Sequence, residues 1–206
     1  MTKNTALLVI DVQNDFCPGG GLAVERGDEI VPVINRLSQA FSVSVLTQDW
    51  HPQDHASLAS NHPGAEAFST VEMAYGTQVL WPDHCIQASS GAAFHPDLVT
   101  DRADLILRKG TNAQIDSYSA FFENDRTTPT GLMGYLRERA IDSLVLSGLA
   151  TDFCVRYSAV DAARLGFKVS LVEDACRAID LNGSLDAAMV EMAEHGIALV
   201  NSETLL

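Results

Sequence analysis

Residues 144–155 read LVLSGLATDFCV, an apolar β-strand pattern that stops at Gly148 and restarts as a helix. This pattern places the thiol of Cys154 at a helix N-terminus. Unpaired backbone N–H groups and the positive end of the helix dipole favour a thiolate there, and the same groups can hold an oxyanion. Because most free cysteines are buried packing residues, a catalytic role for Cys154 depends on what the rest of the chain supplies.

Similar apolar runs alternate with helical periodicity along the chain. Strands are predicted at residues 6–12, 43–47, 105–107, 144–147, 169–172 and 198–200. Helices are predicted at residues 29–41, 130–139, 151–165 and 185–195, the second with Thr130 as its N-cap. Strands that are apolar on both faces and alternate with helices predict an α/β fold, a Rossmann-like three-layer αβα sandwich around a six-stranded, mostly parallel sheet.

The composition fits a single domain over residues 1–206. The chain is 47% hydrophobic, and no Ser-, Gly- or Pro-rich linker divides it. Its formal net charge is −14, with only 13 Lys and Arg. This charge argues against binding to nucleic acid or to an anionic membrane, so a small-molecule substrate is expected.

The N-terminal apolar run is short and lacks both a basic region and a small-residue cleavage site, which predicts a cytoplasmic protein. No apolar run approaches membrane-spanning length. The four cysteines are widely spaced and are expected to be reduced thiols. The sequence assigns no role to Cys17, Cys85 or Cys176, and it leaves the oligomeric state open, a homo-oligomer included.

Reactive side chains follow three of the predicted strands. In a parallel α/β sheet the site lies beyond the carboxyl ends of the strands, and the sequence places Asp11, Lys109 and Cys154 there. A carboxylate can take the thiol proton, while an ammonium group holds the carboxylate and lowers the thiol pKa. Taken singly, Asp11 is explained as a carboxylate that anchors a loop by hydrogen bonds, and Lys109 as a solvent-exposed lysine at the end of a strand. Together the three residues predict a catalytic triad.

Asp49 and His51 alternate along an extended segment, so both side chains point to one side and can bind one metal ion. The stretch of about residues 49–101 is a long loop region rich in His, Pro and Gly. It offers several candidates for a third ligand: His55, His62, Asp83 and His84. One carboxylate with two imidazoles suits zinc, iron or manganese better than magnesium or calcium. The alternative is that Asp49 caps a turn and the histidines are ordinary loop residues.

Five segments, in order along most of the chain, together carry a resemblance to a known family. They are LVIDVQNDF (8–16), TQDWHP (47–52), WPDHC (81–85), RKG with DSYSAF (108–110 and 116–121), and GLATDFCV (148–155). The chain resembles the nicotinamidases, also called pyrazinamidases, of the isochorismatase-like cysteine hydrolase superfamily. Isochorismatases, carbamoylsarcosine amidases and ureidoacrylate amidohydrolases share the catalytic segments and generally lack the Asp-x-His and Trp-Pro-x-His-Cys segments.

The resemblance implies a metal-dependent amidohydrolase of NAD salvage that cleaves the linear amide C–N bond of nicotinamide. The products are nicotinate and ammonia, formed through a cysteine thioester, and pyrazinamide is a further expected substrate. The implied catalytic triad is Asp11, Lys109 and Cys154. The implied ligands of one divalent transition metal ion, zinc ahead of iron or manganese, are Asp49, His51 and His84. His55, Ser57 or water alone would complete the metal site.

The resemblance also implies the contacts of the substrate. Phe16 and Trp81 match aromatic positions that sandwich the pyridine ring, with core packing as their alternative role. A cis peptide before Ala150 would aim the amides of Ala150 and Cys154 into an oxyanion hole.

Two other functions stay open from the sequence. A sibling hydrolase acting on isochorismate or a ureido acid would use the same fold without a catalytic metal. A non-catalytic binding protein is the second alternative, although it would have no need for a thiol beside a base.

Overall fold

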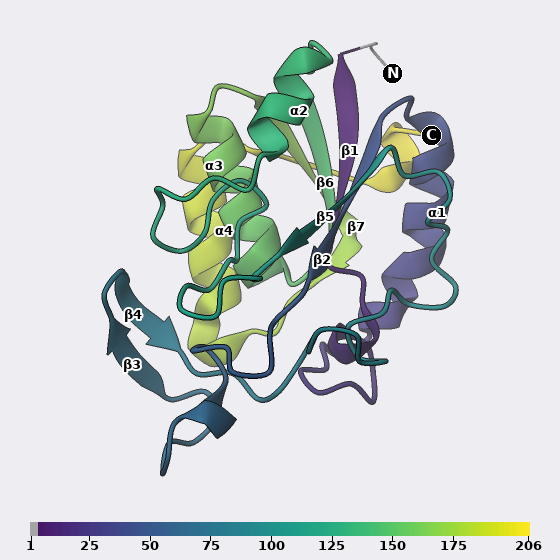
Figure 1. Ribbon diagram of the computed structural model, residues 1–206. Helices are drawn as coiled ribbons and strands as arrows, with labels where there is room; N and C mark the ends of the chain where they lie inside the picture. The colour runs from purple at the N-terminus through teal and green to yellow at the C-terminus, as the bar shows by residue number, and fades with distance from the viewer. Residues whose placement is uncertain (1–3) are drawn as a thin grey trace.

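The fold, described here by a computed structural model for residues 4–206, is a three-layer αβα sandwich (Figure 1). Six strands form a parallel sheet in the order β5-β2-β1-β6-β7-β8. Their bounds are β1 Thr5–Ile10, β2 Ser44–Asp49, β5 Leu105–Lys109, β6 Ser143–Leu149, β7 Lys168–Arg177 and β8 Ala198–Val200. The predicted fold class is confirmed.

Helices cover both faces of the sheet. One face carries α1 (Val31–Ala40), and the other carries α2 (Leu132–Glu138), α3 (Arg156–Arg164) and α4 (Ser184–Glu194) (Figure 1). All six residues of β1 are buried, and they alternate between two cores: Leu8 and Ile10 pack on the α2–α4 side, and Leu7 and Val9 on the α1 side. This double burial is the reason that β1 is apolar from Ala6 to Ile10.

The loop region of residues 49–101 contains a hairpin that its sequence did not predict. Strands β3 (Thr70–Met73) and β4 (Gly76–Val79) pair antiparallel, apart from the main sheet. Both strands are short and mostly exposed or half-buried, so they lack the apolar alternation that marks a longer strand. Short 3₁₀ turns lie at Asn14–Phe16, Gly27–Ile30, Ala59–Asn61, Leu181–Gly183 and Ser202–Thr204.

Two predicted helix starts differ from the structure. The helix predicted at residues 151–165 begins with a π-helical turn, Thr151–Val155, and α3 starts only at Arg156. The Ala150 carbonyl accepts from Val155 N–H at 3.1 Å, the long spacing that defines this turn. At α2, the N-cap is Gly131 rather than Thr130. The Thr130 hydroxyl donates to the Ala120 carbonyl at 2.6 Å and accepts from the Leu132 N–H at 3.3 Å.

The sheet order places reactive side chains on neighbouring strands. Lys109 ends β5, Asp49 ends β2 and Asp11 follows β1, while β6 leads into the turn that carries Cys154. The order of connection reverses between β1 and β6, and such a switch point is where open α/β sheets bind ligands.

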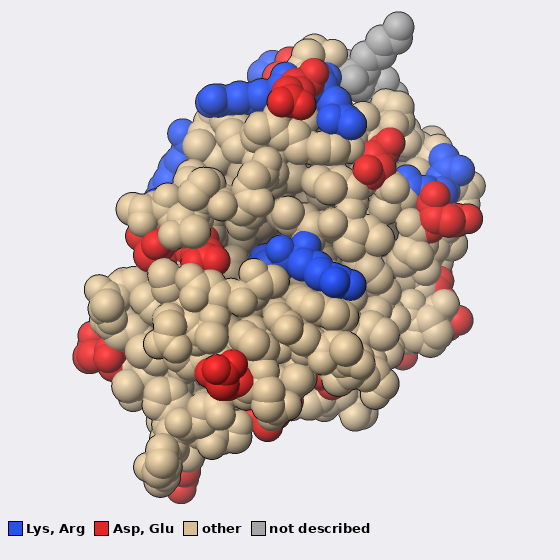
Figure 2. Space-filling view, viewed as in Figure 1, with Lys and Arg blue, Asp and Glu red and all other residues tan. Residues whose placement is uncertain are grey.

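No helix within residues 4–206 is long and apolar enough to cross a membrane. On the face shown in Figure 2, the Lys and Arg side chains form separate groups rather than one continuous basic stripe. This surface fits a chain with 27 Asp and Glu and 13 Lys and Arg.

Gly148 allows β6 to approach β1 next to Asp11. It pairs with Ile10, its φ is +120°, and a Cβ atom there would lie 2.1 Å from the Ile10 carbonyl oxygen. We expect Gly148→Ala to lower the free energy of unfolding by about 3–5 kcal/mol in urea denaturation, from backbone strain and overpacking together. Gly134→Ala in α2 is the matched control, because nothing lies within 4 Å of its Cβ position. The control should be neutral or stabilising by up to about 1 kcal/mol, and equal losses in both variants would contradict this account.

Candidate active site and metal centre

The buried side chain of Lys109 connects the parts of the site. Its Nζ atom lies 2.8 Å from Asp11 Oδ2 and 2.9 Å from Asp49 Oδ1. It also donates to the Ser117 carbonyl at 2.8 Å and lies 3.4 Å from the Cys154 Sγ. Burial would lower the pKa of Lys109, but the two carboxylates outweigh burial and raise this pKa well above its ordinary value. Lys109 is therefore a fixed positive charge between two acids and a thiol.

Asp11 is held in place by β2. Its backbone turns out of β1 with a φ of +47°, and its Oδ1 accepts from the Thr47 hydroxyl at 2.6 Å. The Asp11 N–H donates back to Thr47 Oγ1 at 3.1 Å. Burial raises the pKa of the Asp11 carboxyl above its usual value, with Lys109 opposing the rise. A raised pKa makes this carboxylate a better proton acceptor than an ordinary aspartate.

Cys154 is buried in the π-helical turn, within reach of Asp11. Its Sγ and one carboxylate oxygen each from Asp11 and Asp49 lie within 4.8 Å of one another. Burial raises the pKa of the Cys154 thiol well above its ordinary value, and Lys109 opposes this rise. The sequence favoured a thiolate at a helix start, but desolvation of the sulphur is the larger effect. The resting group is therefore a thiol that needs a base.

Asp49, His51 and His84 form a second cluster. Asp49 Oδ2 lies 3.3 Å from His51 Nε2 and 3.8 Å from His84 Nε2. His51 Nδ1 donates to the Gly110 carbonyl at 3.0 Å, and His84 Nδ1 donates to the Pro82 carbonyl at 2.8 Å. These two bonds place the ring protons on Nδ1 and leave both Nε2 lone pairs for a metal ion. The donor set of one carboxylate and two imidazoles fits a divalent transition metal.

Burial and the neighbouring charges shift the pKa of all three residues, and the carboxylate of Asp49 raises the pKa of His51. Burial would raise the pKa of Asp49, but Lys109 and His51 outweigh it and hold this pKa well below its usual range. Burial and the neighbouring His51 lower the pKa of His84 to about 4, so its ring is neutral at pH 7. Gly110 makes room for the His51 ring, since a Cβ atom at Gly110 would lie 2.5 Å from His51 Cε1.

The other candidate ligands lie outside this cluster. His62 and Asp83 form hydrogen bonds elsewhere in the loop region. The His55 ring lies 4.3 Å from the ring of His51, and its Nδ1 is 2.7 Å from the Ser57 hydroxyl. His55 and Ser57 therefore flank the cluster, and their part in holding a metal ion stays a prediction.

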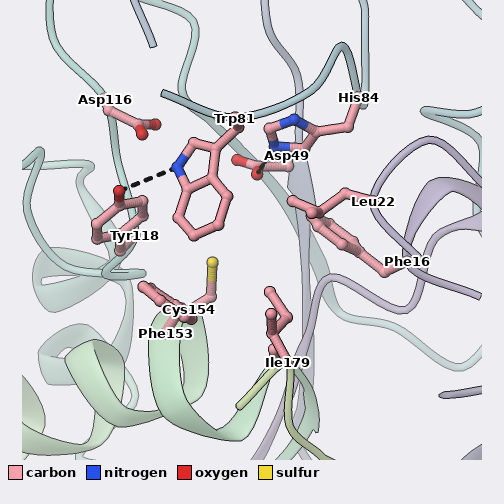
Figure 3. A pocket seen from close by; sticks show the side chains of 11 residues that line it. Phe16, Leu22, Asp49, Trp81, His84, Asp116, Tyr118, Phe153, Cys154 and Ile179 are labelled. Carbon is pink, nitrogen blue, oxygen red and sulfur yellow. Dashed lines mark hydrogen bonds and ion pairs between the residues drawn. The ribbon is translucent and has the colours of Figure 1, made fainter. Parts of the chain in front are cut away.

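A pocket opens over Cys154, and Figure 3 shows the sulphur pointing into it. Mostly aromatic and aliphatic side chains line it, together with two members of the Asp49, His51 and His84 cluster. The lining residues are Phe16, Leu22, Asp49, Trp81, His84, Asp116, Tyr118, Ala150, Phe153, Cys154 and Ile179. The two residues predicted to contact the substrate, Phe16 and Trp81, both line this pocket.

Several lining residues were missed in the sequence. Trp81 Nε1 donates to Tyr118 Oη at 3.0 Å, and the Trp81 ring meets Phe153 edge-on at 4.9 Å (Figure 3). Tyr118 and Phe153 stand inside the quoted motif segments, which could have identified them. Leu22 and Ile179 stand outside every motif, and only the folded chain brings them to the pocket.

Ala150 joins β6 to the nucleophile turn. The peptide bond between Leu149 and Ala150 is cis, where the family resemblance places one. Ala150 also lines the pocket beside Cys154. The use of the Ala150 and Cys154 amides as an oxyanion hole stays a prediction.

The sheet, the thiol with its acid and ammonium partners, and the pocket together have the form of an isochorismatase-like hydrolase. A family model for the isochorismatase domain matches residues 5–204. The chain belongs to the isochorismatase family.

Within the family, its similarity is to proteins named nicotinamidase. The nicotinamidase of Acinetobacter baylyi is 52% identical over 204 residues, which cover 99% of this chain and 95% of that protein. The structure of a nicotinamidase/pyrazinamidase from Acinetobacter baumanii has a TM-score of 0.99 and 56% identity, and covers 100% of both chains. The structure of a Pyrococcus horikoshii pyrazinamidase in complex with zinc has a TM-score of 0.77 and 35% identity, over 96% of this chain and 99% of that one.

The charge of Lys109 can be tested by its removal. We expect Lys109→Met, measured by urea unfolding with a chelator present, to lose about 3–5 kcal/mol at pH 7 because Asp11 and Asp49 stay buried without a cation. The loss should shrink toward acid pH. In the variant, protonation at low pH removes the uncompensated charge of the two carboxylates. In the wild type, the lowered pKa of Asp49 adds stability at pH values above the pKa of Asp49 in the unfolded chain, and this stability is lost as the pH falls.

Lys168→Met is the control, since Lys168 is the other lysine within residues 4–206 and is exposed. Its effect should stay within about 0.5 kcal/mol at both pH values. A pH-independent loss in the Lys109 variant would contradict the electrostatic explanation.

Proposed function

We propose that this protein is a nicotinamidase, which hydrolyses nicotinamide to nicotinate and ammonia. The observation that carries the proposal is that the Asp49, His51 and His84 cluster lies beside Cys154, with Asp49, His84 and Cys154 lining one aromatic pocket. A pocket with a metal centre at one end and a thiol at the other suits a ring with a nitrogen atom and a carboxamide. The full-length identity to a named nicotinamidase supports the same activity.

A metal ion would be held by Asp49 Oδ2 and by the Nε2 atoms of His51 and His84. When bound, the ion would supply a Lewis acid for the ring nitrogen of the substrate, directly or through water. We favour zinc over iron or manganese, in keeping with the donor set and the zinc complex of the related pyrazinamidase. Lys109 binds the other oxygen of Asp49 and so orients this carboxylate.

The pocket residues would hold the substrate over the thiol. Phe16 and Trp81 would contact the two faces of the pyridine ring, and Phe153 and Tyr118 would support Trp81. Fixing a small ring in this way supplies the orientation that the reaction needs.

Asp11 would then act as the base. It takes the thiol proton, Cys154 Sγ attacks the amide carbon, and the amides of Ala150 and Cys154 stabilise the oxyanion. Asp11 returns the proton to the departing ammonia, which leaves a thioester. Water activated by Asp11 hydrolyses the thioester to nicotinate and restores the thiol, while Lys109 stabilises the charge on Asp11 throughout.

Wider expectations follow from this activity. Pyrazinamide, in which the ring carries a second nitrogen, would fit the same pocket. We place the reaction in NAD salvage in the cytoplasm. A sibling hydrolase that needs no metal would have no use for the two histidines whose Nε2 atoms face Asp49.

Loss of the nucleophile tests the reaction. We expect Cys154→Ala to reduce ammonia release from nicotinamide by at least about 10⁴-fold, because no other side chain replaces the sulphur. Cys176→Ala, which alters a buried cysteine that does not line this pocket, should keep most of the activity. Wild-type protein that releases no ammonia with metal supplied would refute the proposal.

Loss of a ligand tests the metal. Purified protein should carry about one transition metal ion per chain, and His84→Ala should lose both the ion and at least about 100-fold of the activity. Metal content is measured by mass spectrometry and ammonia release by a coupled assay. His95→Ala, which changes a histidine outside the cluster, should match the wild type in both. Full activity without bound metal would instead favour the sibling hydrolase.

A further inference from the structure

The connection between β7 and α4 forms one wall of the pocket. Ile179 lies in this connection, and Figure 3 shows it on the far side of Cys154 from Trp81. The residues that follow have an irregular path, since Asp180, Asn182 and Gly183 all have left-handed φ values. A segment of this kind is not held by a regular hydrogen-bond ladder, so contacts from outside must fix it.

Asp152 supplies such contacts. Its side chain is buried in the π-helical turn, two residues before Cys154. Oδ1 accepts from the Ile179 N–H at 3.0 Å. Oδ2 accepts from the Asp180 N–H at 2.8 Å and from the Ser184 hydroxyl at 2.5 Å. One carboxylate therefore ties Ile179 and Asp180, near the start of the connection, and Ser184, the first residue of α4, to the nucleophile turn.

We propose that Asp152 is a positioning residue that sets the pocket wall at Ile179 relative to Cys154, and thereby limits which ring substituents the pocket admits. For the identity of the substrate, this inference rests on the proposed function. The argument is geometric: the backbone of Ile179 is itself a donor to Asp152, and Asp152 is two residues from the sulphur. If the carboxylate contacts are lost, the wall and the nucleophile can move apart.

The chemistry of the contact requires a carboxylate. All three partners are donors, and a carboxylate offers only acceptors. In Asp152→Asn, whichever way the amide is oriented, its NH₂ group faces at least one backbone N–H. Bonds to a charged acceptor are also stronger than those to a neutral amide.

Steady-state kinetics with two substrates tests the proposal. For Asp152→Asn we expect the KM for nicotinamide to rise at least about 10-fold, while kcat changes less than about threefold. The preference for nicotinamide over a ring-methylated nicotinamide should fall at least about fivefold, because the wall no longer excludes the methyl group. If Asp152→Asn does not fold, Ser184→Ala removes one donor and keeps the carboxylate. It should shift KM and preference the same way, by about two- to threefold.

Asp174→Asn is the matched control. Asp174 makes a similar contact on β7, accepting from the Ser202 N–H at 2.8 Å and the Ser202 hydroxyl at 2.5 Å, and it does not line the pocket. This variant should lose thermal stability but keep KM and substrate preference within about twofold of the wild type. Equal changes in substrate preference in both variants, or a change in stability alone for Asp152→Asn, would overturn the proposal.

Thiol alkylation gives a readout that needs no turnover. Modification of Cys154 by iodoacetamide and by the bulkier N-phenylmaleimide is followed by mass spectrometry. In Asp152→Asn the rate ratio of bulky to small reagent should rise at least about fivefold, since Ile179 is free to move. An unchanged ratio would overturn the role of Asp152. If the wild type fails to hydrolyse nicotinamide, the proposed function fails, and this ratio still tests Asp152.

Discussion

The buried ammonium group of Lys109 is the contact on which the site depends. It lies within 3 Å of Asp11 and Asp49, at the ends of neighbouring strands. Two carboxylates so close together could not both stay ionised in a dry interior without it. Even so, Lys109 and the two carboxylates together carry a net charge of −1. A divalent ion bound to Asp49 would make this net charge positive. A positive charge there would favour the thiolate and the oxyanion that the proposed reaction forms at Cys154. The metal centre and the nucleophile are thus linked by charge as well as by position.

Much of this arrangement could be predicted from the sequence because it follows from the topology. Apolar runs such as residues 6–10 show which segments are strands, and the parallel order brings the residues after them to one edge. Asp11, Lys109 and Cys154 needed no more than that rule to be placed together. The sequence pattern ended the strand before Gly148, whereas β6 continues through it to Leu149 and comes close to Ile10 there.

The rest depends on contacts between residues far apart in the sequence, which no local pattern records. Thr47 holds Asp11 from the neighbouring strand, and Ile179 reaches the pocket through an irregular connection tied to Asp152. The π-helical turn was also missed, because its residues have ordinary helical character and only the position of the Ala150 carbonyl gives the longer spacing. The β3–β4 hairpin is too short and too exposed to leave an apolar pattern.

The ionisation of Cys154 shows best how local reasoning can point the wrong way. A helix start lowers a thiol pKa by up to a few units when the sulphur is accessible to water. Here the sulphur is buried, and desolvation raises the pKa instead. The same desolvation raises the pKa of Asp11, so the donor and the acceptor of the proton shift in the same direction. Proton transfer from Cys154 to Asp11 is therefore easier than the burial of either group alone implies. The transfer moves a negative charge from Asp11 to Cys154 within one dry site beside Lys109, and it creates no new charge.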